Sequence, residues 1–140
     1  MKGLKITLWV CAIFFLLSFL FVPLPWRTFT ALFNQSGVQI PAAEPFTVFL
    51  ARISLMTFGM IGVFFAILAR NPLKYGEMLL LAAYGLLLFG LLALIGSILY
   101  ILPNSLPITI IGTIVKVAIY FILGALILLF RNEAIQANNA

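Results

Sequence analysis

Residues 78–102 read MLLLAAYGLLLFGLLALIGSILYIL and contain no charged side chain. A run of this length and apolarity predicts a helix that crosses a membrane, because about 20 such residues span the hydrocarbon core of a bilayer. At about 1.5 Å of rise per residue the run is about 37 Å long, enough to cross with some tilt. This segment places the chain among integral membrane proteins.

Three further apolar runs flank this segment, at residues 6–22, 46–69 and 108–130. The second and third of these are also long enough to span, whereas the first, at about 25 Å, is marginal. Because the first run follows two lysines, a cleaved signal peptide is the alternative interpretation. No small-x-small cleavage site follows Val22, and the chain continues into a proline-rich stretch that ends at Trp26. We therefore expect a retained first span.

The predicted architecture is thus all-α, a single transmembrane domain over residues 1–140 built as a four-helix bundle. Of the 140 residues, 65% are hydrophobic and only 8% are charged, and the mean hydropathy is +1.27. A soluble domain carries about a quarter charged residues, so the composition agrees with a membrane protein. The net charge of +5 is dispersed along the chain, unlike the clustered bases of a nucleic-acid-binding face.

The scarcity of cysteine and the absence of histidine limit the catalytic and metal-binding chemistry that the chain can carry out. The single cysteine, Cys11, excludes an intramolecular disulfide and a CxxC redox pair. Histidine is absent, which removes the usual general base and the commonest zinc ligand. We accordingly predict no catalytic residue, no metal site and no cofactor.

The cations at the segment ends predict the orientation. The termini and the loop on one predicted side of the membrane carry Lys2, Lys5, Arg70, Lys74 and Arg131. The loops on the other side carry only Arg27. The positive-inside rule then places both termini in the cytoplasm. We expect a multi-pass protein of the bacterial inner membrane.

A short helix is predicted in the first external loop, over residues 26–34. Trp26, Phe29 and Phe33 recur at helical spacing among polar residues, a pattern typical of a helix that lies in the membrane interface. A simple anchor is the main interpretation, and a lid over a substrate entrance is the alternative.

Small residues predict where helices pack, because they let backbones approach each other in lipid. The second span has Gly59, Gly62 and Ala66 on one face. The third has one stripe that includes Gly85 and Gly96, and a second, neighbouring stripe of Ala83, Gly90 and Ser97. We expect these stripes to be packing seams, within one bundle or between two copies.

Two cations, Arg52 and Lys116, lie inside the apolar runs, where a charge costs at least about 2.5 kcal/mol. Counted from the external ends of their spans, they lie about 9 Å and about 12 Å deep. Thr109, Thr113 and Tyr120 fall within about 60° of Lys116 around the helix. If the second and fourth spans adjoin, the two cations approach each other, with Tyr100 of the third span at similar depth.

Two accounts of these cations remain open. In the first, both side chains extend to the external headgroups, and Glu44 at the outer mouth supplies a countercharge. In the second, they line an outward-facing pocket for a carboxylate, a phosphate, a lipid headgroup or a quinone oxygen. The candidate anion- or headgroup-binding residues are Lys116, Arg52, Thr113, Tyr120, Thr109 and Tyr100.

Three short stretches of the chain resemble those of a known family of small membrane proteins. The opening MKGLK of residues 1–5, the ARNPLK turn of residues 69–74 and the LILLFR end of residues 126–131 resemble small bacterial four-span proteins of the BphX-like and DoxX-like kind. Some DoxX-like proteins are linked to respiratory or redox complexes, so the resemblance implies an accessory role. It carries over no catalytic residue.

The sequence thus favours a non-enzymatic accessory subunit, or a bundle that binds lipid or quinone in a cationic pocket. The alternative is a small transporter or channel for an anionic solute. The expected partners are membrane lipids and either another membrane protein or further copies of the chain, with no nucleic acid.

Overall fold

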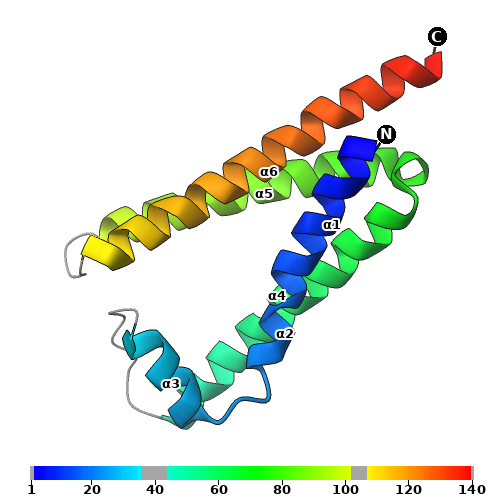
Figure 1. Ribbon diagram of the computed structural model, residues 1–140. Helices are drawn as coiled ribbons and strands as arrows, with labels where there is room; N and C mark the ends of the chain where they lie inside the picture. Colours follow the sequence, from blue (N-terminus) through cyan, green and yellow to red (C-terminus); the bar gives the residue numbers. More distant parts are fainter. Residues whose placement is uncertain (1, 36–43, 102–106, 140) are drawn as a thin grey trace.

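The computed structural model describes residues 2–35, 44–101 and 107–139, and nearly all of these are helical (Figure 1). Four helices within the described residues are long and apolar enough to cross a membrane, at Lys2–Phe21, Pro45–Arg70, Gly76–Leu99 and Ile110–Asn132. The prediction of an all-α protein with four candidate spans is confirmed. The chain is a multi-pass membrane protein.

The first span consists of α1 (Lys2–Leu16) and α2 (Ser18–Phe21). Leu17, between them, keeps a right-handed helical backbone, and its N–H donates to the carbonyl oxygen of Ile13 at 3.0 Å. The two helices therefore form one nearly continuous rod. It starts at Lys2, four residues before the predicted boundary at Ile6.

The helix α3 (Trp26–Gln35) occupies the residues predicted for a short helix. The rings of Trp26 and Phe29 stack with their centroids 5.2 Å apart, and the hydroxyl of Thr30 donates to the carbonyl oxygen of Arg27. The placement of α3 in the membrane interface stays a prediction, and the side chain of Phe33 lies outside the described part of the chain.

The remaining spans are set by prolines and turns. The helix α4 (Pro45–Arg70) has a proline as its first residue, a favoured position because proline has no N–H to leave unbonded. It ends before Asn71-Pro72, since a residue that precedes proline avoids the helical backbone. A short 3-10 turn, η1 (Pro72–Tyr75), leads into α5 (Gly76–Gly96), which continues as a π-helical turn, η2 (Ser97–Ile101). The last helix, α6 (Pro107–Asn139), runs beyond the predicted end at Phe130.

The four spans form two antiparallel pairs. The helix α4 packs mainly on α1, and α6 packs mainly on α5, while α1 makes a smaller contact with α6 and α4 only a slight one with α5. The two pairs meet at the end that carries Lys2, Lys5, Arg70, Lys74 and Arg131, here called the basic end. They separate toward the opposite end, here called the open end, where α2 ends and α6 begins (Figure 1).

Each pair is held by a glycine at a close approach. A Cβ added at Gly62 of α4 would lie 2.6 Å from the backbone nitrogen of Leu16, and one at Gly124 of α6 would lie 3.1 Å from the carbonyl oxygen of Ala83. The small-residue face predicted on α4 therefore packs against α1. In α5 the packed stripe is the one with the buried Ala83 and Gly90.

The other predicted stripe of α5, which also includes the buried Ala82, is open at its two glycines. A Cβ added at Gly85 or at Gly96 meets no atom within 4 Å. The two stripes lie side by side on the helix, and α6 covers only one of them because α4 turns away toward α1.

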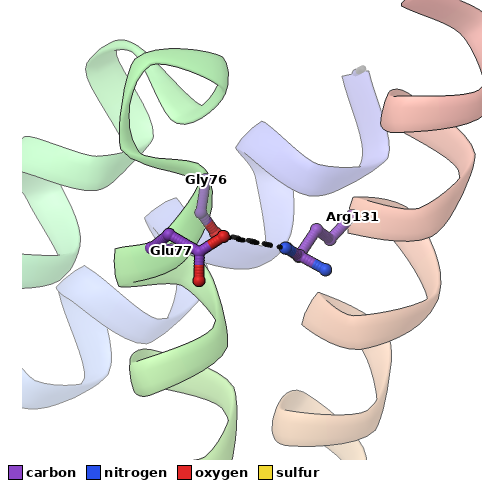
Figure 2. A network of polar contacts seen from close by, with 3 residues as sticks. All are labelled: Gly76, Glu77 and Arg131. Carbon is purple, nitrogen blue, oxygen red and sulfur yellow. Dashed lines mark hydrogen bonds and ion pairs between the residues drawn. The ribbon is translucent and has the colours of Figure 1, made fainter. Parts of the chain in front are cut away.

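The basic end is tightly packed. Leu4 and Leu8 of α1, Leu68 of α4, Leu79 of α5 and Ile127 of α6 are all buried there. Arg131 reaches from α6 to the first turn of α5 (Figure 2): its Nε donates to the carbonyl oxygen of Gly76 at 3.2 Å, and its Nη2 lies 3.8 Å from Oε1 of Glu77. The buried side chains join the two helix pairs at this end, and Arg131 links the two helices of the α5–α6 pair.

Candidate functional site

A cavity of about 370 Å³ lies between the helix pairs on the side of the open end, here called the Lys116 cavity. Its walls come from α1, α2, α4 and α6. Among the described residues Lys116 is the one charged residue of the lining, and Ser18 and Tyr120 contribute hydroxyl groups. The lining consists of Phe14, Phe15, Leu17, Ser18, Phe21, Leu55, Phe58, Lys116 and Tyr120.

The packing of Tyr120 explains why Lys116 faces this cavity. The Tyr120 ring lies 6.2 Å from the rings of both Phe14 and Phe15, measured between centroids, so this face of α6 is turned toward α1. Lys116 precedes Tyr120 by one helical turn on the same face. It therefore faces the same cavity as Phe14 and Phe15 of α1.

Three aromatic rings of the lining, together with Phe89, which does not itself line the cavity, form a cluster on the side of the basic end. Phe15 contacts Phe58 at 6.2 Å and Tyr120 at 6.2 Å, and Phe89 contacts the same two rings at 5.5 Å and 5.6 Å. This aromatic quartet takes one ring from each span, and each ring lies about 20 Å along its helix from the first residue. The quartet therefore closes the middle of the bundle.

The structure places Lys116 and Tyr120, but not Arg52, in the cavity. Arg52 and Lys116 are both exposed, but the cavity wall from α4 is made by Leu55 and Phe58 and not by Arg52. The prediction that the two cations approach each other required α4 and α6 to be neighbours. The pairing of α4 with α1 and of α6 with α5 does not meet that condition.

The structure does not place the other predicted site residues in the lining of the Lys116 cavity. Thr113 is half-buried one turn before Lys116 and does not line the cavity. The side chains of Tyr100 and Thr109 lie outside the part of the chain that the structure describes. Glu44 is exposed in an extended backbone conformation just before α4, and the described residues contain no ion pair between it and either cation.

Sequence reasoning missed the aromatic quartet and Ser18. The chain has 14 phenylalanines, and nearly every apolar run contains several, so their spacing does not reveal which rings turn inward. Ser18 is a common type of residue in membrane helices. Only the divergence of the two helix pairs brings these side chains to one cavity.

The arrangement suits an amphipathic ligand. The ammonium group of Lys116 and the hydroxyls of Tyr120 and Ser18 offer hydrogen bonds to an anionic or carbonyl oxygen. The remaining lining is aliphatic and aromatic, which fits an apolar body. The described residues contain no cluster of three or more side chains of the kind that hold a metal ion.

We compared the chain with known proteins. No protein-family model, curated protein or solved structure matches it. The resemblance to BphX-like and DoxX-like proteins stays a prediction.

Proposed function

We propose that this chain is a small non-enzymatic protein of the bacterial inner membrane that binds an amphiphile, a lipid or a quinone, in the Lys116 cavity. The observation that carries the proposal is that the described lining of this cavity has a single cation, Lys116, among almost wholly apolar residues. The polar head of the ligand accepts hydrogen bonds from Lys116, and its apolar part packs against the aromatic quartet.

Electrostatics supports an anionic or strongly polar head. A lysine at this depth in a bilayer costs at least about 2.5 kcal/mol when it has no partner. No hydrogen bond or ion pair of the Lys116 ammonium occurs among the described residues. A ligand oxygen within hydrogen-bond distance supplies the missing partner, and its attraction is strong because the surroundings have a low dielectric constant.

In the proposed orientation both termini are cytoplasmic, so the basic end faces inward and the Lys116 cavity opens in the outer half of the membrane. The helix α3 then lies in the outer interface, with Trp26 and Phe29 as its anchor. A ligand enters sideways from the outer leaflet, between the two helix pairs. In this arrangement the protein is an accessory subunit that holds a lipid or quinone for a membrane partner.

The aromatic quartet favours this function over transport of an anionic solute. A transport path has to continue through the middle of the bundle, where rings from all four spans contact one another at 5.5–6.2 Å. The Lys116 cavity ends at these rings, which is the shape of a binding pocket.

Mass spectrometry of the protein isolated in native membrane patches tests the proposal. We expect an amphiphile with an anionic or carbonyl head to be enriched with the wild-type chain and to be lost from Lys116→Met. Arg52→Met is the matched control, because it removes a cation at similar depth that does not line the cavity.

The control variant retains the ligand if the cavity is the site. Equal enrichment of the same lipid by all three proteins contradicts the proposal, because the lipid then binds elsewhere on the surface. Anion flux in liposomes that depends on Lys116 contradicts it in favour of the transport alternative.

A further inference from the structure

A second cavity, of about 190 Å³, lies between α4 and α5 and is here called the apolar cavity. The residues that the structure describes in its lining include no polar side chain, and the lining takes Phe64 and Phe65 from α4 and Leu81 and Leu86 from α5. Gly85 also lines it, and a Cβ added there meets no atom within 4 Å. The cavity thus reaches the backbone of α5.

Phe15 separates the two cavities, because it lines both of them. The apolar cavity also reaches Phe89, whose ring contacts Phe58 of the Lys116 cavity at 5.5 Å. Phe15 therefore has the Lys116 cavity on one side and the apolar cavity on the other, and Phe89 packs against Phe58 of the Lys116 cavity.

The two cavities follow each other along the bundle. In the α5–α6 pair, Gly90 lies beside Tyr120, and Gly124 lies beside Ala83 and Leu87. This register places Gly85 about 13 Å nearer the basic end than Lys116. A hydrocarbon chain whose head is bound at Lys116, and which runs toward the middle of the membrane, meets the apolar cavity next.

We propose that the apolar cavity is a second subsite, which takes the hydrocarbon tail of the amphiphile whose head binds at Lys116. This inference rests on the proposed function. The tail runs along Phe15, which lines both cavities and stacks on Phe65 at 5.8 Å, and the aromatic quartet stays closed. The ligand class is then a single-chain amphiphile, such as a long-chain fatty acid, with an oxyanion head and an unbranched tail.

Photo-crosslinking tests the tail subsite directly. The protein in nanodiscs of phosphatidylcholine is exposed to hexadecanoic acid that carries a diazirine near its methyl end, and the labelled residues are located by mass spectrometry. We expect adducts on the α5 segment 81–89. Gly85→Leu fills the apolar cavity without meeting another atom at its Cβ, and should reduce these adducts about tenfold.

The control is Gly96→Leu, because Gly96 is equally open and lines neither cavity. It should label like the wild type, and circular dichroism checks that all variants keep their helices. Adducts spread evenly over the lipid-facing surface, or unchanged by Gly85→Leu, overturn the tail subsite.

A shorter probe separates this inference from the proposed function. Octanoic acid binds through its head without filling the apolar cavity, so its binding should depend on Lys116 and not on Gly85. If octanoate still requires Lys116 while Gly85→Leu leaves hexadecanoate binding unchanged, the tail subsite alone fails. If neither acid responds to Lys116→Met, the proposed function fails as well.

Discussion

The spans are similarly apolar at the two ends of the bundle, but they pack in opposite ways. At the basic end, side chains from all four spans are buried together, and Arg131 links α6 to the first turn of α5. At the open end the same helices diverge, so that Leu20 of α2 and Ile114 of α6 are exposed. An apolar sequence therefore does not by itself produce a packed interior. The Lys116 cavity exists because the two helix pairs are joined at one end only.

The largest expected effect comes from forcing apart the α1–α4 pair. Gly62→Leu places a side chain where even a Cβ would lie 2.6 Å from the Leu16 nitrogen. Because backbone cannot move aside as a flexible side chain does, we expect a loss of about 3 kcal/mol or failure to fold. Size-exclusion chromatography and circular dichroism in detergent measure the outcome, and Gly96→Leu should behave like the wild type. A well-folded Gly62→Leu variant refutes the close approach of the two helices.

A smaller effect distinguishes the two ends within the first span. Leu8 is 0% exposed near the basic end, and Leu20 is 66% exposed near the open end. Leu8→Ala leaves a cavity among packed helices and should lower the free energy of unfolding by about 2 kcal/mol. Leu20→Ala exchanges one lipid-facing group for another and should change it little. Equal losses for the two variants in denaturant titrations contradict the difference in packing.

The smallest effect concerns the link in Figure 2. Arg131→Gln removes the hydrogen bond to the Gly76 carbonyl and should destabilise the protein by about 1 kcal/mol. The Arg131 side chain is 16% exposed whereas that of Glu77 is 91% exposed, so most of the stabilisation comes from the carbonyl. Glu77→Gln should therefore leave the unfolding midpoint unchanged. A larger loss for Glu77→Gln than for Arg131→Gln would show that the ion pair matters more than the hydrogen bond.

The existence of four candidate spans and of a helix near residues 26–34 could be predicted from the sequence. Hydropathy over a window of about 20 residues decides whether a helix can cross a membrane. The Asn71-Pro72 turn likewise marks the end of α4. These features depend on local sequence alone.

The pairing of the helices could not be predicted in the same way. A lipid-facing residue and a helix-facing residue are equally apolar, so hydropathy does not say which neighbour a face has. The stripe with Gly85 and Gly96 looked as good a seam as the stripe with Ala83 and Gly90, and only the second is covered by α6. The separation of Arg52 from Lys116 follows from this pairing.

The most direct test of the central claim is a binding titration of hexadecanoate with the protein in phosphatidylcholine nanodiscs, with empty nanodiscs subtracted. Wild type, Lys116→Met and Arg52→Met are compared at the same protein concentration. We predict that Lys116→Met raises the Kd about tenfold or more, equivalent to at least about 1.4 kcal/mol, and that Arg52→Met leaves it unchanged. Equal Kd values for the wild type and Lys116→Met, or a greater loss in Arg52→Met, would contradict the assignment of the Lys116 cavity as the binding site.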